Sequence, residues 1–116
     1  MVDRSLIRQA LNNIINNSIH AVNENGLIVI TSSVDETGLY QIIKIQDNGT
    51  GIDPDDIDKI FDPGFTLKKT GTGLGLAIVE KIILEHNGKI LCRSAIGQGT
   101  EFVLMFQSNI GARDNG

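Results

Sequence analysis

Two glycine-rich stretches and the segment between them could form a phosphate site. Residues 46–52 read Gln-Asp-Asn-Gly-Thr-Gly-Ile, and residues 71–76 read Gly-Thr-Gly-Leu-Gly-Leu. Glycines let the backbone approach a ligand closely, and a helix that begins near Gly73 would point its free N–H groups into the same space. Lys68, between the two stretches, would add positive charge. These features together are typical of a phosphate site, whereas the second stretch taken alone is explained equally by the glycines of a flexible loop.

Asp47, in the first of these stretches, requires a different ligand group, because a carboxylate repels phosphate. In the strand expected at residues 39–47 it shares a face with Ile43 and Ile45, so it would lie at the end of a buried layer. An Asp before Asn-Gly is also common in turns. The functional alternative is an acceptor for the exocyclic amine of adenine, which would favour ATP over GTP by a few kcal/mol at most.

Two asparagines could bind a metal ion. In the helix expected at residues 6–22, Asn13 and Asn17 flank the apolar stripe, whereas Asn12 and Asn16 fall on the opposite face. A partly buried amide without partners costs about 1–3 kcal/mol, so Asn13 and Asn17 need hydrogen-bond partners or a ligand. Neighbouring backbone could supply the partners. The alternative is a side-chain oxygen that binds Mg²⁺, a cation that prefers oxygen ligands.

The apolar patterning predicts the elements that would position these residues. Helical spacing covers residues 6–22 and 72–86, and Asp53-Pro54 indicates a short helix with Asp53 as its N-cap. Runs rich in β-branched residues predict strands at residues 27–34, 39–47, 89–94 and 100–106. The order predicts an α+β fold: a two-layer α/β sandwich with a mixed, mostly antiparallel sheet covered by helices on one face.

Composition limits the class of protein. The chain has 116 residues, 41% of them hydrophobic, and a formal net charge of −4, and it has no apolar run of the length of about 18 residues that a membrane span requires. We expect residues 1–107 to form one cytoplasmic domain and residues 108–116 a disordered tail. The negative charge and the few aromatic residues argue against a nucleic-acid surface, and no direct membrane contact is expected.

Two further residues have simple structural interpretations. Cys92 is the only cysteine, so it cannot form an internal disulfide. We expect it to be a small core or strand residue, a reactive thiol being the alternative. His86 precedes the Asn-Gly stop of the second long helix and is expected to be only a residue of its last turn.

The motifs, in this order, resemble those of the ATP-binding catalytic domain of sensor histidine kinases, which has the Bergerat fold of a superfamily that includes gyrase, a heat-shock chaperone and the mismatch-repair ATPase. The resemblance extends from Leu6 to Phe106. Four segments are similar to the family's N box, first glycine box, F box and second glycine box, respectively Gln9–Val22, Asp47–Ile52, Phe61–Thr66 and Gly71–Leu76.

This resemblance implies roles for individual residues. Asn17 would be a catalytic residue and the Mg²⁺ ligand, and Asp47 would accept from adenine, with Gly49 and Gly51 against the base. The residues that would reach the phosphates are Lys68, Thr72, Gly73 and Gly75. The remaining nucleotide-binding residues would be Ile52, Phe65, Thr66, Gly71, Leu74 and Leu76, together with His20, which is as well explained as an exposed helix residue.

The chain departs from the family pattern in two ways. The first departure is Gly64, which stands where an aromatic residue is frequent and bears on the packing of the lid hinge; the lid at residues 62–72 is short and resembles that of the compact-lid members of the family. The segment that carries the acceptor histidine is absent from these 116 residues. The expected partners are therefore a separate histidine-bearing dimerisation domain of the same kinase and, indirectly, a response regulator. The isolated domain is expected to be monomeric.

Asn13, assigned a catalytic role, distinguishes between reaction classes. In relatives that hydrolyse ATP, a Glu at the matching position deprotonates the attacking water, and an amide cannot accept that proton. We therefore expect the domain to bind Mg-ATP and to donate the γ-phosphate to a histidine on the acceptor domain, with positioning and charge neutralisation supplying most of the catalysis. The alternatives are an ATPase of the gyrase or mismatch-repair type, an anti-sigma-factor serine kinase and a degenerate docking domain.

Overall fold

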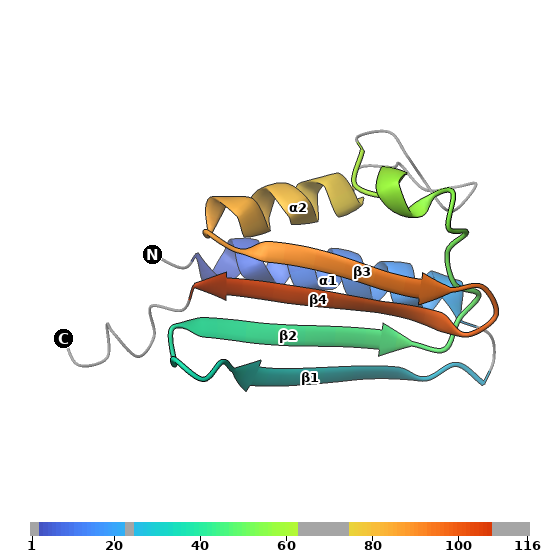
Figure 1. The fold of residues 1–116 in the computed structure, drawn as a ribbon, viewed down its shortest axis with the longest axis horizontal. Helices are drawn as coiled ribbons and strands as arrows, with labels where there is room; N and C mark the ends of the chain where they lie inside the picture. The colour runs from blue at the N-terminus through green and yellow to red at the C-terminus, as the bar shows by residue number, and fades with distance from the viewer. Residues whose placement is uncertain (1–2, 23–24, 63–74, 108–116) are drawn as a thin grey trace.

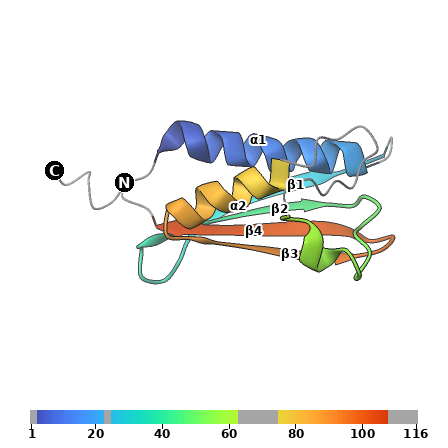
Figure 2. The ribbon, with the colours of Figure 1, turned by 90° about the horizontal axis from the view of Figure 1, so that it is seen from above.

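The computed structural model describes residues 3–22, 25–62 and 75–107. Its elements in chain order are α1 (Arg4–Ala21), β1 (Ile28–Val34), β2 (Tyr40–Asp47), the 3-10 turn η1 (Ile57–Lys59), α2 (Gly75–Glu85), β3 (Lys89–Ala95) and β4 (Gly99–Gln107). Both helices lie over the same face of the sheet (Figure 1, Figure 2). The predicted α+β two-layer sandwich is confirmed. The tail predicted at residues 108–116 and most of the predicted lid lie outside the described residues.

The sheet consists of two hairpins joined along their inner strands. Its strand order is β1-β2-β4-β3, and every pair among the described strands is antiparallel. The two hairpins, β1-β2 and β3-β4, are those that the sequence predicts. In the central pairing of β2 with β4, Ile45 lies opposite Phe102 and Asp47 opposite Thr100. The end of β2 and the start of β4 therefore meet at one end of the sandwich (Figure 1).

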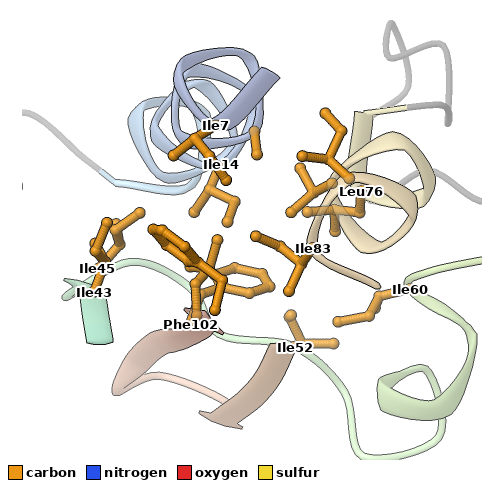
Figure 3. Packing of buried hydrophobic residues seen from close by; sticks show 14 residues of the cluster. Ile7, Ile14, Ile43, Ile45, Ile52, Ile60, Leu76, Ile83 and Phe102 are labelled. Atoms are coloured by element: carbon orange, nitrogen blue, oxygen red, sulfur yellow. The ribbon is translucent and has the colours of Figure 1, made fainter. Parts of the chain in front are cut away.

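The core lies between the helices and the inner face of the sheet (Figure 3). Ile14 of α1, Ile83 of α2 and Ile45 of β2 are fully buried. Alternation along β4 places Phe102 and Leu104 on this face, as predicted, and both are buried. Burial of an aliphatic or aromatic side chain of this size contributes about 1.5–3 kcal/mol, so this layer holds the helices on the sheet.

The segment between β2 and α2 differs from its prediction. The Asp53 carboxylate accepts the Asp55 N–H at 2.8 Å and caps a turn, and the only regular piece among the described residues of the segment is η1, which begins at Ile57. The predicted short helix is present as a turn capped by Asp53 and followed by a 3-10 helix, which begins at Ile57 and is only three residues long. Ile52 and Ile60 anchor the segment, because both side chains are buried in the core (Figure 3).

The start of α1 is joined to the end of α2. Asp3 is the N-cap of α1, and its Oδ1 accepts the N–H groups of Ser5 at 3.0 Å and Leu6 at 3.2 Å. The hydrogen bond from the Ser5 hydroxyl, followed by that from the Leu6 N–H, holds the pKa of Asp3 below its ordinary value of 3.8. His86 is buried, and its Nε2 accepts the Asp3 N–H at 3.0 Å. His86 thus links the two helices, a role that the sequence did not predict.

Neither of the two described helices is both long enough and apolar enough to cross a membrane.

Candidate functional site

A cavity of about 270 Å³ opens where α1, β2 and β4 meet, beside the start of α2. This volume is just below the range of about 300–1,000 Å³ that is typical of small-molecule sites. Six residues predicted to bind nucleotide line it: Asn17, His20, Asp47, Gly51, Ile52 and Leu76. They come from α1, β2, the loop after β2 and α2, so the fold brings together positions that are up to 59 residues apart in sequence.

The remaining predicted site residues are either described residues that are not among those lining this cavity or residues that the structure does not describe. Asn13 and Gly49 are described but do not line this cavity. Gly75 is the first residue of α2. Seven further residues of the prediction fall outside the described part of the chain: Phe65, Thr66, Lys68, Gly71, Thr72, Gly73 and Leu74.

The asparagines of α1 separate as the helical pattern predicts. Asn13 and Asn17 are half-buried, whereas Asn12 and Asn16 are exposed. Asn17 lines the cavity, so its amide can present an oxygen to a ligand there. His20, one turn later at the cavity rim, is exposed, and its Nδ1–H donates to the Asn16 carbonyl oxygen at 2.7 Å.

Asp47 is a buried carboxylate that the protein satisfies only in part. It is 5% exposed, and its Oδ1 accepts the Gly49 N–H at 2.8 Å. Its Oδ2 makes no hydrogen bond, and no cationic side chain pairs with it, within the described ranges. Because a buried charge without partners is costly, the open oxygen in the cavity wall indicates a site for a hydrogen-bond donor of a ligand.

The glycines after Asp47 let the loop pack against two other elements. A Cβ on Gly49 would collide with the Ala21 carbonyl at the end of α1, and a Cβ on Gly51 would collide with the Ala95 carbonyl at the end of β3. Gly51 also has a φ of +79°, which favours glycine. These glycines therefore allow the close packing that places Asp47 and Gly51 in the cavity wall.

The sequence did not predict the roles of Thr100, which lines the cavity, and of Ser94, which contacts two residues of the cavity wall. Thr100 lines the cavity, is 6% exposed and lies opposite Asp47 in the sheet. The Ser94 hydroxyl lies 2.8 Å from the Thr100 hydroxyl and accepts the Ile52 N–H at 2.7 Å. A signal for Thr100 was present, since it is a polar residue on the same strand face as Phe102 and Leu104. Nothing in the sequence placed Ser94 beside the loop after β2.

Cys92 has the structural role that was predicted for it. Its side chain packs against the core from β3. Burial, and secondarily the negative charge of Asp47, raise the pKa of Cys92 to about 12. The thiolate is the reactive form, so this cysteine is held in its unreactive state near neutral pH.

Comparison with known proteins gives consistent matches over most of the chain. The family model for histidine kinase-, DNA gyrase B- and HSP90-like ATPases matches residues 2–110. The chain is 41% identical over 112 residues to the sensor histidine kinase ZraS of Escherichia coli (strain K12), a match that covers 97% of this chain and 24% of that protein. It is 44% identical over 107 residues to the signal transduction histidine-protein kinase AtoS of the same strain, covering 92% and 17%.

Solved structures show the same relationship. The catalytic domain of the histidine kinase ThkA, in a nucleotide-free form, matches with a TM-score of 0.80 and 39% identity, covering 91% of this chain and 68% of that one. The chain thus spans about a quarter or less of the sensor kinases above, but two thirds of an isolated catalytic domain. On this sequence and structural evidence, the chain belongs to the family of histidine kinase-, DNA gyrase B- and HSP90-like ATPases, and within it is similar to the catalytic domains of sensor histidine kinases.

Proposed function

We propose that the chain binds Mg-ATP in the cavity and donates the γ-phosphate to a histidine on a separate dimerisation domain, as the phosphoryl donor of a two-component system. The observation that carries the proposal is Asp47, a buried carboxylate with an open oxygen in the wall of the cavity. An exocyclic amine of adenine would supply the missing donor. The match to sensor histidine kinases supports phosphoryl transfer to histidine.

The residues of α1 fit the phosphate end of such a ligand. Asn17 offers an amide oxygen in the cavity wall, the kind of ligand that Mg²⁺ prefers. When bound, Mg²⁺ neutralises charge on the phosphates of the nucleotide. His20, on the next turn of α1, would lie near the same phosphates.

Asn13 supports transfer rather than hydrolysis. It is half-buried on α1, one turn before Asn17. An amide cannot accept a proton from water, so this position supplies no general base for hydrolysis. The base for attack by a histidine would come from the acceptor domain, and this chain would contribute the position of the γ-phosphate.

Calorimetric titration of the full chain with Mg-ATP and Mg-GTP tests the proposal. We expect ATP to bind more tightly, and Asp47→Asn to weaken ATP binding roughly 10- to 150-fold, the range for a hydrogen bond to a charged group. An asparagine at this position would keep an acceptor for the Gly49 N–H, so the loop should remain folded. Asp53→Asn is the matched control, since Asp53 also lines the cavity but is exposed, and ATP affinity should change little.

Phosphoryl transfer is tested with γ-labelled ATP and the histidine-bearing domain of a similar sensor kinase. We expect acid-labile phosphate on that domain and little free phosphate. Failure of the parent chain to bind ATP, or equal binding by parent and Asp47→Asn, would refute the proposed site. Binding of ATP with release of free phosphate and no transfer would instead favour an ATPase.

A further inference from the structure

The hydroxyl of Ser94 joins both walls of the cavity. Ser94 is half-buried on β3, and three groups lie within hydrogen-bond distance of its Oγ. These are the Ile52 N–H at 2.7 Å, the Gly99 carbonyl oxygen at 2.8 Å and the Thr100 Oγ1 at 2.8 Å. Ile52 belongs to the loop after β2, whereas Gly99 and Thr100 begin β4, so one hydroxyl contacts both segments that flank Asp47.

The chemistry of these groups assigns the protons. An N–H can only donate and a carbonyl can only accept, so Ser94 accepts from Ile52 and directs its single hydrogen to the Gly99 carbonyl. The contact with Thr100 is then a hydrogen bond only if the Thr100 hydroxyl donates to Ser94. If Ser94 instead donated its hydrogen to Thr100, the Ser94 Oγ and the Gly99 carbonyl oxygen would lie 2.8 Å apart with no hydrogen between them.

This assignment determines what Thr100 can offer to a ligand. Because its hydrogen is directed to Ser94, the Thr100 hydroxyl presents only lone pairs to the cavity. Asp47, directly opposite on β2, also presents only lone pairs. Side chains opposite each other in an antiparallel pair have Cβ atoms about 4.5–5.5 Å apart, so both acceptors can face one ligand group.

We propose that Ser94 is a positioning residue that holds the Thr100 hydroxyl as an acceptor and thereby makes the cavity selective for an amino purine over an oxo purine. The amino group of adenine carries two N–H donors, one for each acceptor. The carbonyl oxygen of hypoxanthine would face two acceptors and leave both unsatisfied. This inference rests on the proposed function and assigns base selectivity within it to the Ser94–Thr100 pair as well as to Asp47.

The test is the ratio of the dissociation constants for Mg-ATP and the magnesium complex of inosine triphosphate, measured by calorimetry on the full chain. In Ser94→Ala, the Thr100 hydroxyl is free to turn and donate to an oxo group. We expect the preference for ATP to fall roughly 2- to 12-fold, the range for a neutral hydrogen bond. Ser94→Thr retains a hydroxyl and should retain the preference.

Repeating the Ser94→Ala measurement in a Thr100→Val background shows whether Ser94 acts by positioning Thr100 or only by stabilising the protein. If Ser94 acts through Thr100, Ser94→Ala should not change the ratio further in a Thr100→Val background. If Ser94 only stabilised the loop after β2, it would weaken both nucleotides equally, and the ratio would stay at its parental value. An unchanged ratio in Ser94→Ala, or a full effect that persists with Thr100→Val, would overturn the proposal.

Two further results keep the test decisive. Thermal unfolding shows whether Ser94→Ala folds. If it does not, Thr100→Val should still lower the preference for ATP, whereas Thr100→Ser should retain it. Equal ratios in these two variants would overturn the proposal. A parent chain that binds neither nucleotide would refute the proposed function itself, and with it this inference. A parent chain that prefers ATP and keeps that preference in Ser94→Ala and Thr100→Val would refute the inference alone, whereas equal binding of both nucleotides would also contradict the assignment of Asp47 to the adenine amine.

Discussion

An aspartate and a histidine meet at one end of the sandwich, where α1 begins and α2 ends, and another aspartate and histidine lie at the opposite end, where α1 finishes. At the first end, Asp3 and His86 form hydrogen bonds within the protein. At the second end, Asp47 and His20 line a cavity. The residue types are the same, but the hydrogen-bond partners differ.

The difference separates a structural use of polar groups from the ligand-binding use that we propose. Both ring nitrogens of His86 are engaged, since Nε2 accepts the Asp3 N–H and Nδ1–H donates to the Ile82 carbonyl oxygen at 2.7 Å. Asp47 uses one carboxylate oxygen for the Gly49 N–H, and the other has no partner within the described ranges. We call the end with Asp3 and His86 the closed end and the end with Asp47 and His20 the open end. Substitutions at the closed end should therefore lower stability, and substitutions at the open end should weaken ligand binding.

The largest effect is expected at the open end, from Asn17→Ala. Loss of the proposed Mg²⁺ ligand should weaken ATP binding in the presence of Mg²⁺ by about 10- to 100-fold or more. Residues that only hydrogen-bond to a metal ligand already have effects of this size. Stability should change little, since alanine is a better helix former than asparagine. Calorimetry with and without Mg²⁺ measures the effect, and Asn16→Ala, one position earlier on the exposed face, is the control. Unchanged affinity in Asn17→Ala would refute the metal-ligand assignment.

The corresponding substitution at the closed end is His86→Ala, which should lower stability and leave ATP binding unchanged. It leaves the Asp3 N–H without its partner and opens a space in a buried position, so the free energy of unfolding should fall by about 1–3 kcal/mol. ATP affinity of the folded protein should remain unchanged. Urea unfolding followed by circular dichroism measures the loss. His20→Ala is the matched control, because His20 is exposed and its removal should not lower stability. Loss of ATP binding in folded His86→Ala would contradict the division between the two ends.

The smallest effect is expected at Cys92, which reports on Asp47 at the open end. The negative charge of Asp47 contributes to the raised pKa of Cys92. Because the pKa of Cys92 is raised from 9.0 to about 12, alkylation by iodoacetamide should stay slow in the folded chain at pH 8–9 and become fast in denaturant. The unfolded chain binds fewer protons than the folded chain between these pH values, so stability should fall as the pH rises from about 9 to 12. Asp47→Asn should shift alkylation to slightly lower pH, as followed by mass spectrometry. Fast alkylation of the folded parent at pH 8 would contradict this.

Local patterns in the sequence predicted much of the site. Helical spacing separated the half-buried Asn13 and Asn17 from the exposed Asn12 and Asn16, and alternation along β2 placed Asp47 on the buried face. Both inferences succeed because the direction of a side chain follows from the period of its own element. At Asp53 the capping signal was correct, but the short helix that follows is the 3-10 turn η1, which begins four residues later.

The sequence alone determined the two long helices, the two hairpins and the motifs of the family, because turn residues, helix ends and side-chain periodicity are local. Only the tertiary structure decided that β2 pairs with β4, which sets Asp47 opposite Thr100 and brings Ser94 to Ile52. It likewise decided that His86 reaches Asp3, 83 residues away in sequence. These contacts depend on how the hairpins and helices bury their apolar faces together. The arrangement is determined by packing across the whole core and not by the sequence of any one segment.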